Sequence, residues 1–338
     1  MSTECAIDRT LVPRAIRIGA VTVRFRGGAS LVERVLGPLK ALEAFEDPSV
    51  PHPTDFVADV ALAAESTPWP PSGTPPEEAV VFEVRDRVAQ VRAPGVGVAA
   101  LLGDGSLSIR VDPAAPDGDA VAERLTIPAL GERMRRMGIY PIHAAILRLP
   151  SPGTGVVVIP AARGGGKTTM ALSLRRERWL MLSDDRGWLT GGIGHAEIDP
   201  WPEPPRVGDR SLFLLPPYAT PGLRDERTGK APVYGLTPPR VDRTFPVVGV
   251  MLPRLVEGPG GVVLPARGAD ALAAVVSQMV VATALDTAGA SFRFAARMMA
   301  YTPAFTVEVG DDPAALARAV EVALAPDRAT GSASGDRA

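Results

Sequence analysis

The sequence predicts an α/β protein in which a mixed β-sheet forms the core and a β-rich region precedes it. Three observations favour this class. Short apolar segments separated by turn residues fill much of the first 120 residues, a glycine-rich strand–loop–helix unit lies near the middle, and helices and strands follow it. We expect a β-rich N-terminal accessory region over 1–120, a core domain over 121–326 and a disordered tail over 327–338.

The N-terminal region begins with a predicted strand and a predicted helix. Residues 14–26 alternate in part between apolar and polar side chains, which is typical of a half-buried strand. A helix is expected over 31–42, with Ser30 as its N-cap and Glu33 at the capping-box position. Pro38 predicts a break or kink inside this helix.

The rest of the N-terminal region predicts mainly strands. Residues 66–78 are rich in proline and predict a loop. An antiparallel meander is expected over the segments 80–84, 88–93, 96–102 and 106–111. A helix over about 119–136 then leads into the core. Such a region could recognise substrate, form a dimer surface, extend the core sheet or serve only as a scaffold.

A β-hairpin is expected at the start of the core. Two apolar segments, 144–149 and 156–159, flank a turn of Pro, Gly, Ser and Thr residues. His143 stands near the start of the first strand. Because a lone histidine is more often structural than catalytic, both roles stay open for it.

The second hairpin strand leads into a glycine-rich loop that predicts phosphate binding. The loop and the start of the next helix contain Arg163, Gly164, Gly165, Gly166, Lys167, Thr168 and Thr169. Consecutive glycines let backbone N–H groups surround phosphate oxygens, and the helix N-terminus favours the same anion. Lys167 can reach the β- and γ-phosphates and Thr168 can bind Mg²⁺. Ala161 stands where the usual motif has its first glycine.

Two adjacent acids follow the next predicted strand. Residues 180–183 predict a buried strand whose C-terminal edge carries Asp184 and Asp185, and the helix of about 167–177 is expected to cross between two parallel strands. One carboxylate can hold Mg²⁺ and the other can accept a proton from a hydroxyl. An N-cap Asp beside a solvated Asp is the alternative interpretation, but the neighbouring loop favours ATP and Mg²⁺ as ligands.

The order of His143, the hairpin, the glycine-rich loop and Ser183-Asp184-Asp185-Arg186 resembles the catalytic core of HPr kinase/phosphorylase. The likeness is closer to the HPr-kinase-related proteins often encoded beside peptide-modification enzymes, including kinases of lasso-peptide precursors. The specific part of this resemblance covers about residues 138–215. The family fold also resembles the nucleotide domain of phosphoenolpyruvate carboxykinase, so the resemblance implies a phosphate-loop fold of that type.

The resemblance also implies roles for individual residues. Asp184 would be the general base, Asp185 would support it or bind Mg²⁺ together with Thr168, and His143 would lie near the acid. Residues 163–169 would bind ATP, and Arg186 matches an arginine that follows the acid pair in the family. The implied acceptor is a serine-type hydroxyl of a peptide or small protein, and a homo-oligomer is implied by analogy.

Downstream, the sequence departs from the family pattern. A further Mg²⁺-binding acid is expected there, and the candidates are Glu197, Asp199 and Glu203. The family signature for the reverse phosphorylase reaction is not recognisable, which puts that reaction and HPr as the acceptor in doubt. Arg206 could hold a phosphate or could be an ordinary surface arginine.

The C-terminal part predicts alternating strands and helices. Residues 216–244 predict a loop region in which 224–230 is exposed and mobile. Strands are expected over 245–255, 261–264 and 304–309, and helices over 270–286 and 291–301. A last helix begins at Pro313 after an Asp cap and ends near residue 324.

Composition excludes several classes of function. The 338 residues carry 36 basic and 38 acidic side chains, so no global basic field favours nucleic acid. Cys5 is the single cysteine and the three histidines are widely separated, which argues against a disulfide or a zinc site. The N-terminus lacks a signal-peptide core, and the apolar stretch 271–285 is too short for a membrane span, so a cytoplasmic protein is expected.

Four functions remain open from the sequence. A Mg²⁺-ATP-dependent kinase acting on a peptide or small protein is the first, and a kinase acting on an amino acid or metabolite is the second. A nucleotide-binding regulatory protein without phosphotransfer is the third. A decarboxylating carboxykinase is the fourth, but its His/Lys/Asp metal set is not found.

Overall fold

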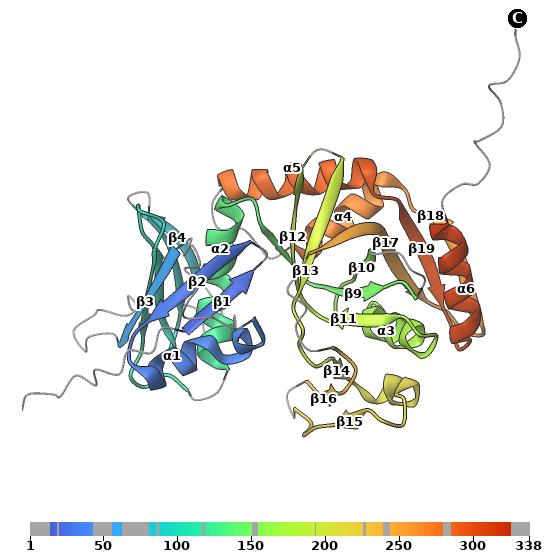
Figure 1. Cartoon of the computed structure of the whole chain (residues 1–338), viewed down its shortest axis with the longest axis horizontal. Coiled ribbons are helices and arrows are strands. Elements are labelled where there is room, and N and C mark those ends of the chain that lie inside the picture. Colours follow the sequence, from blue (N-terminus) through green and yellow to red (C-terminus); the bar gives the residue numbers. More distant parts are fainter. Residues whose placement is uncertain are drawn as a thin grey trace, which may run out of the picture.

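The computed structural model shows a mixed α/β protein with two main sheets (Figure 1). The described residues are 14–18, 20–42, 56–62, 81–85, 88–116, 119–150, 155–192, 194–225, 228–238, 244–279 and 285–325. The expected proline-rich loop at 66–78 and the expected tail at 327–338 lie outside them. Every helix within the described ranges is too short or too polar to traverse a bilayer.

The N-terminal sheet has seven strands in the order β1-β2-β3-β7-β6-β5-β4. Its strands are β1 (Arg14–Ile18), β2 (Val21–Arg26), β3 (Phe56–Leu62), β4 (Val81–Arg85), β5 (Val88–Ala93), β6 (Gly97–Leu101) and β7 (Leu107–Val111). The antiparallel meander β4–β7 confirms the prediction. The single strand expected over 14–26 is wrong, because this segment forms the β1–β2 hairpin. β3 joins the β1–β2 hairpin to the β4–β7 meander, because it pairs in parallel with β2 on one side and with β7 on the other.

A short helix, α1 (Ala29–Leu36), covers part of this sheet and runs into a 3-10 helix, η1 (Gly37–Leu42). The change of helix type beside Pro38 confirms the expected break. The capping box is wrong: Ser30 lies inside α1, and the N-cap is Gly28 without a side-chain bond. The expected partner of the cap, Glu33, instead forms ion pairs with Arg14 (2.8 Å) and Lys40 (2.5 Å).

The helix expected over 119–136 is present and packs against the N-terminal sheet. It contains a π-helical stretch, η2 (Ala122–Thr126), followed by α2 (Ile127–Arg136). Buried side chains of this helix, including Leu125 and Leu130, belong to the same hydrophobic cluster as the sheet. We call the β1–β7 sheet with α1, η1, η2 and α2 the N-terminal body. The hydrophobic core of the N-terminal body also contains Trp188 and Trp201, which come from the region of the central sheet described next.

The central sheet has nine strands, and β11-β9-β10-β17-β13-β12-β8 is its main path. Its strands are β8 (Tyr140–Ile142), β9 (Ala144–Arg148), β10 (Val156–Pro160), β11 (Leu180–Ser183), β12 (Gly187–Gly192), β13 (His195–Pro200), β17 (Phe245–Leu255), β18 (Gly260–Pro265) and β19 (Ala304–Val309). The β9–β10 hairpin confirms the prediction. The expected parallel crossover is only partly correct, because β10 and β11 share a direction but β9 lies between them.

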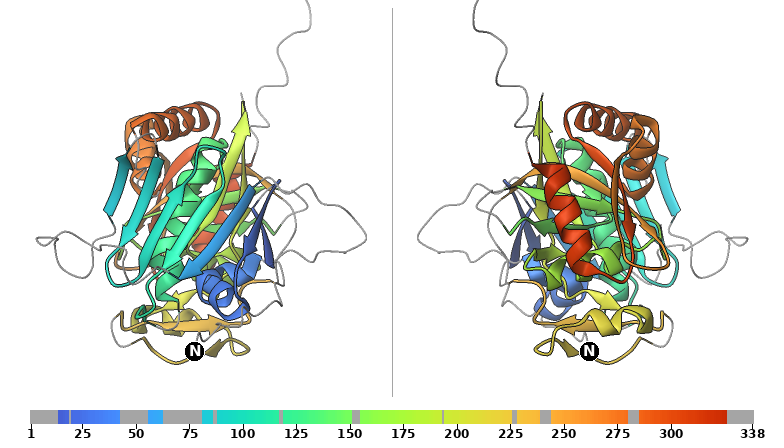
Figure 2. Two further views of the ribbon diagram at one scale, coloured as in Figure 1. Left: turned by 90° about the vertical axis from the view of Figure 1, so that its left-hand side faces the viewer. Right: turned by 90° about the vertical axis from the view of Figure 1, so that its right-hand side faces the viewer.

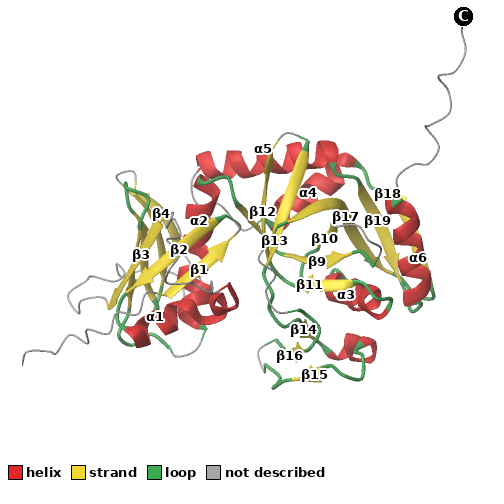
Figure 3. Cartoon of the chain, viewed as in Figure 1, coloured by secondary structure: helices red, strands yellow, loops and turns green. Residues whose placement is uncertain are grey.

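Helices cover both faces of the central sheet. Successive side chains of a strand point to opposite faces, so apolar residues at neighbouring positions pack against different helices. Leu147, Val157 and Ile159 pack with α3 (Lys167–Arg176) and α6 (Pro313–Leu324). The intervening Ile146 and Val158 pack with α4 (Gly268–Gln278) and α5 (Leu285–Tyr301). Figure 3 shows these two helix layers around the strands, and Figure 2 shows the N-terminal sheet and α6 at opposite ends of the molecule.

The C-terminal elements follow the prediction with two differences. The expected loop region 216–244 contains two strands, which join a small sheet next to η3 (Asp209–Leu214). Its strands are β14 (Arg206–Val207), β15 (Thr220–Pro221) and β16 (Ala231–Tyr234). The helix expected over 270–286 ends at Gln278, and the next one begins earlier than expected, at Leu285. The predicted α6 cap is confirmed, since the Asp312 side chain accepts a hydrogen bond from the Ala315 N–H.

Replacing Trp188 should destabilise the whole fold, because its indole is 2% exposed and stacks on Trp201 within the shared core. We expect Trp188→Ala to lower the free energy of unfolding by about 3–5 kcal/mol. The measurement is urea denaturation followed by circular dichroism. Leu223→Ala is the matched surface control, because Leu223 is 93% exposed, and equal effects of the two changes would contradict the packing described.

Candidate functional site

The glycine-rich loop between β10 and α3 leaves the N-terminus of α3 without a side-chain cap. Gly164 and Gly166 have φ values of 82° and 92°, which favour glycine. A Cβ at Gly166 would also lie 2.9 Å from Leu255. Because the first N–H groups of a helix have no partner within the helix, this end can receive an anion. Ala161, at the position where a glycine is usual, is the first residue after β10.

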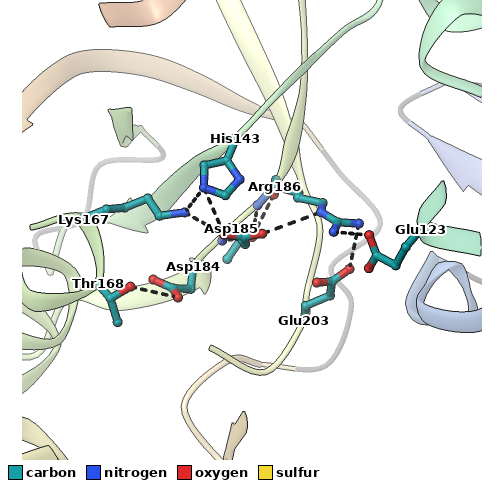
Figure 4. Close-up of polar contacts among 9 residues, drawn as sticks. Glu123, His143, Lys167, Thr168, Asp184, Asp185, Arg186 and Glu203 are labelled. Carbon is teal, nitrogen blue, oxygen red and sulfur yellow. Dashed lines mark hydrogen bonds and ion pairs between the residues drawn. The ribbon is translucent and has the colours of Figure 1, made fainter. Parts of the chain in front are cut away.

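Lys167, the first residue of α3, points back to the residues that follow β11 and precede β9 (Figure 4). Its Nζ atom lies 2.7 Å from Asp185 Oδ1 and 2.8 Å from His143 Nε2. Burial and the charge of Lys167 lower the pKa of His143, so the neutral ring accepts a hydrogen bond from the ammonium group. Burial alone would raise the pKa of Asp185, but the charge and the hydrogen bond of Lys167, together with the charge of Arg186, outweigh it and lower that pKa.

The neighbouring acid, Asp184, has a different environment. It is 3% exposed, and its Oδ2 atom accepts a hydrogen bond from Thr168 Oγ1 at 3.2 Å. Its Oδ1 atom is buried without a hydrogen-bond partner in the described part of the chain. Burial raises the pKa of Asp184 to about 6, although Lys167 acts in the opposite direction. The two adjacent carboxyl groups therefore have pKa values displaced in opposite directions.

Arg186 connects this acid pair to the N-terminal body. Its Nη2 atom lies 2.6 Å from Glu123 Oε2, its Nη1 atom 3.7 Å from Glu203 Oε1 and its Nε atom 3.7 Å from Asp185 Oδ2. The guanidinium group also stacks over the Trp201 ring at 5.1 Å. Burial raises the pKa of Glu203 to about 7 despite the opposite effect of Arg186.

The structure separates the three acids expected downstream. Glu203 lies beside Arg186, whereas Glu197 accepts a hydrogen bond from Thr244 at 2.9 Å. Asp199 is buried on β13. Arg206 lies 3.6 Å from Asp225 and is more than half exposed. Glu203 therefore contacts Arg186, which also contacts Asp185 of the acid pair.

Several residues at the site carry no clear signal in the sequence. Glu123 lies 63 positions before Arg186 in a helix with many arginines, so spacing gives no indication of their contact. Ser211 shares a hydrogen bond of 3.0 Å with Thr169, and it lies in a segment that contains no recognisable motif. Trp201, between two prolines, is the one residue whose context could have indicated a buried anchor. Lys230, from the expected loop, adds positive charge near Asp184.

The oxygen atoms near Thr168 fit Mg²⁺ better than a transition metal. A hydroxyl group lies beside a buried carboxylate that has one oxygen unpartnered, and Mg²⁺ prefers such oxygen ligands. Within the described ranges, no cluster of three His, Cys, Asp or Glu side chains could hold a metal ion. Mg²⁺ commonly needs only one or two protein carboxylates, because phosphate and water supply its other ligands.

Comparison of the whole chain with protein-family models and with curated proteins found no match. The function must therefore be inferred from the geometry of the site and the motifs in the sequence.

The burial of Asp184 should appear in the pH dependence of stability. Its pKa is raised from 3.8 to about 6, so the native state keeps a proton that the unfolded chain loses. The wild type should lose stability relative to Asp184→Asn as pH rises from 4 to 7. We expect the stability difference between the two to change by about 1–3 kcal/mol over this range. Urea denaturation without nucleotide and Mg²⁺ measures it, and a pH-independent difference would contradict the burial of this carboxyl group.

Proposed function

We propose that this protein is a Mg²⁺-dependent kinase that transfers the γ-phosphate of a nucleoside triphosphate, ATP in the first instance, to a hydroxyl group. The observation that carries the proposal is the contact between two sets of residues. Lys167 and Thr168, at an uncapped helix N-terminus behind a glycine-rich loop, directly contact Asp185 and Asp184 at the end of β11. This arrangement supports the phosphate-loop fold and the HPr-kinase resemblance expected from the sequence.

Binding of the triphosphate would rearrange the Lys167 contacts. The loop N–H groups and the α3 N-terminus would hold phosphate oxygens, and Lys167 would move its ammonium group from Asp185 and His143 toward them. When bound, Mg²⁺ neutralises charge on the phosphate oxygens. Thr168 and Asp184 are the residues that would hold the ion, because they lie in contact and Asp184 keeps an unpartnered oxygen.

The contacts favour an exchange of the roles that the sequence suggests for the two aspartates. Asp185 is 37% exposed at its side chain, whereas Asp184 is buried beside Thr168. We assign proton acceptance to Asp185 and metal binding to Asp184. In the transfer step the acceptor hydroxyl gives its proton to Asp185 and its oxygen bonds the γ-phosphorus. The bond from that phosphorus to the β-γ bridging oxygen breaks, and the nucleoside diphosphate leaves.

Exposed apolar side chains near the site favour a peptide or small protein as the acceptor over a metabolite. Phe213, Tyr218, Leu223 and Tyr234 are each more than half exposed and lie in or beside the small sheet. This segment is joined to α3 by the hydrogen bond between Ser211 and Thr169. Exposed aromatic groups are frequent anchors for polypeptide partners.

Removal of the Lys167 ammonium group should weaken triphosphate binding. We expect Lys167→Met to raise the dissociation constant of Mg²⁺ with a non-hydrolysable ATP analogue at least tenfold, since the charge-assisted phosphate contact is lost. Arg176→Ala is the matched control, because Arg176 is an exposed cation in the last turn of the same helix. Isothermal titration with ATP and GTP analogues measures both, and equal affinities would refute phosphate binding by Lys167.

The two aspartates should differ in how their loss affects catalysis. We expect Asp185→Asn to lower kcat about 100-fold at any Mg²⁺ concentration, because the proton acceptor is removed. Asp184→Asn should raise the Mg²⁺ concentration needed for half-maximal rate at least tenfold, because a metal ligand is removed. Transfer of label from γ-labelled ATP to peptides at varied Mg²⁺ measures both effects. The opposite pattern would restore the roles expected from the sequence, and labelled-ATP binding without transfer or hydrolysis would favour a regulatory protein.

A further inference from the structure

The surroundings of Arg186 come from separate parts of the chain. Arg186 follows the acid pair, Glu123 belongs to the helix of the N-terminal body, and Trp201 and Glu203 follow β13. Figure 4 shows the guanidinium group between Asp185 on one side and the two glutamates on the other. The shortest of these contacts, 2.6 Å, joins Arg186 to Glu123. The firmest ionic partner of Arg186 therefore lies outside the central sheet.

The N-terminal body also fixes the surface on which Arg186 rests. Trp201 is 1% exposed and stacks on Trp188, and both are buried in the hydrophobic cluster of that body. The backbone N–H of Trp201 donates a hydrogen bond to the backbone carbonyl of Arg186 at 3.0 Å. A buried, stacked indole has little freedom to move, so it restricts the position of the guanidinium group above it.

Arg186 and Lys167 hold opposite oxygens of one carboxylate. Lys167 lies 2.7 Å from Asp185 Oδ1, and Arg186 Nε lies 3.7 Å from Asp185 Oδ2. If Lys167 turned to the triphosphate, as proposed above, Arg186 would remain as the cation beside Asp185. A guanidinium group without its closest acid would rotate toward the remaining carboxylates, Glu203 and Asp185, and would change the orientation of Asp185.

We propose that Glu123 is a positioning residue of this site, acting through Arg186 on Asp185, so that the N-terminal body completes the catalytic centre. The catalytic consequence rests on the proposed kinase function, whereas the physical linkage of Glu123, Arg186 and Asp185 does not. The experiment therefore has one arm with phosphotransfer and one without.

The kinetic arm compares Glu123→Gln with Glu33→Gln. The control removes an acid of the same N-terminal body whose ion pairs, with Arg14 and Lys40, do not involve Arg186. We expect Glu123→Gln to lower kcat about tenfold while the KM for ATP stays within twofold, and Glu33→Gln to change neither. An unchanged kcat in Glu123→Gln, or equal losses in both variants, would overturn the proposal.

The second arm tests whether Glu123 and Asp185 are energetically coupled, by a double-mutant cycle in which the unfolding equilibrium constant is measured. Glu123 and Asp185 both contact Arg186, so Glu123→Gln and Asp185→Asn should change the unfolding equilibrium constant non-additively, by at least threefold. The same cycle in an Arg186→Gln background should be additive. Additivity in the wild-type background would overturn the inference even if the protein transfers phosphate. Absence of transfer with a non-additive cycle would instead refute the kinase function and keep the linkage.

Discussion

The buried ammonium group of Lys167 is the constraint on which the site depends. The residue is 8% exposed, and burial of an isolated charge is so unfavourable that the amine must have partners. Asp185 and His143 supply them at 2.7 and 2.8 Å, and each comes from the end of a different strand. This requirement draws the start of α3, the end of β11 and the start of β9 together. The three segments that pair this buried cation are therefore the same segments to which we assign phosphate transfer.

Two adjacent aspartates acquire different chemistry because their surroundings differ. Asp185 lies between two cations, Lys167 and Arg186, which lower its pKa and keep its carboxylate charged. Asp184 is buried, and among the described residues its side chain has the Thr168 hydroxyl as its hydrogen-bond partner, so burial favours its protonated form. A divalent ion beside Thr168 would supply the missing positive charge and would remove the reason for the raised pKa. The contact with Thr168 and the unpartnered Oδ1 atom of Asp184 are the features that favour the proposed cation at this position.

Local patterns in the sequence predicted most elements, whereas contacts between distant segments were not predictable. The apolar segments 245–255 and 304–309 became β17 and β19 with the expected bounds, because alternation and length determine such strands. The parallel pairing of β3 was not foreseen, because a strand's partner depends on packing rather than on its own residues. Ser30 shows the same limit. Although serine is a favoured capping residue, α1 starts at Ala29 with Gly28 as its N-cap, so Ser30 lies inside the helix. At the site, the loop and acid pair followed from local spacing, but Glu123 did not.

The domain boundary was expected near residue 120, where the predicted strands of the N-terminal region end. The hydrophobic core of the N-terminal body extends beyond that position. The helix at 120–136 packs with the N-terminal sheet, and Trp188 and Trp201 enter the same cluster from the other side of the boundary. Because stacked, fully buried indoles cannot leave that cluster without exposing a large apolar area, the N-terminal body and the β12–β13 region must move together. Arg186 rests on one of these indoles and contacts Asp185. A ligand that shifted the N-terminal body would therefore act on the acid pair through Arg186.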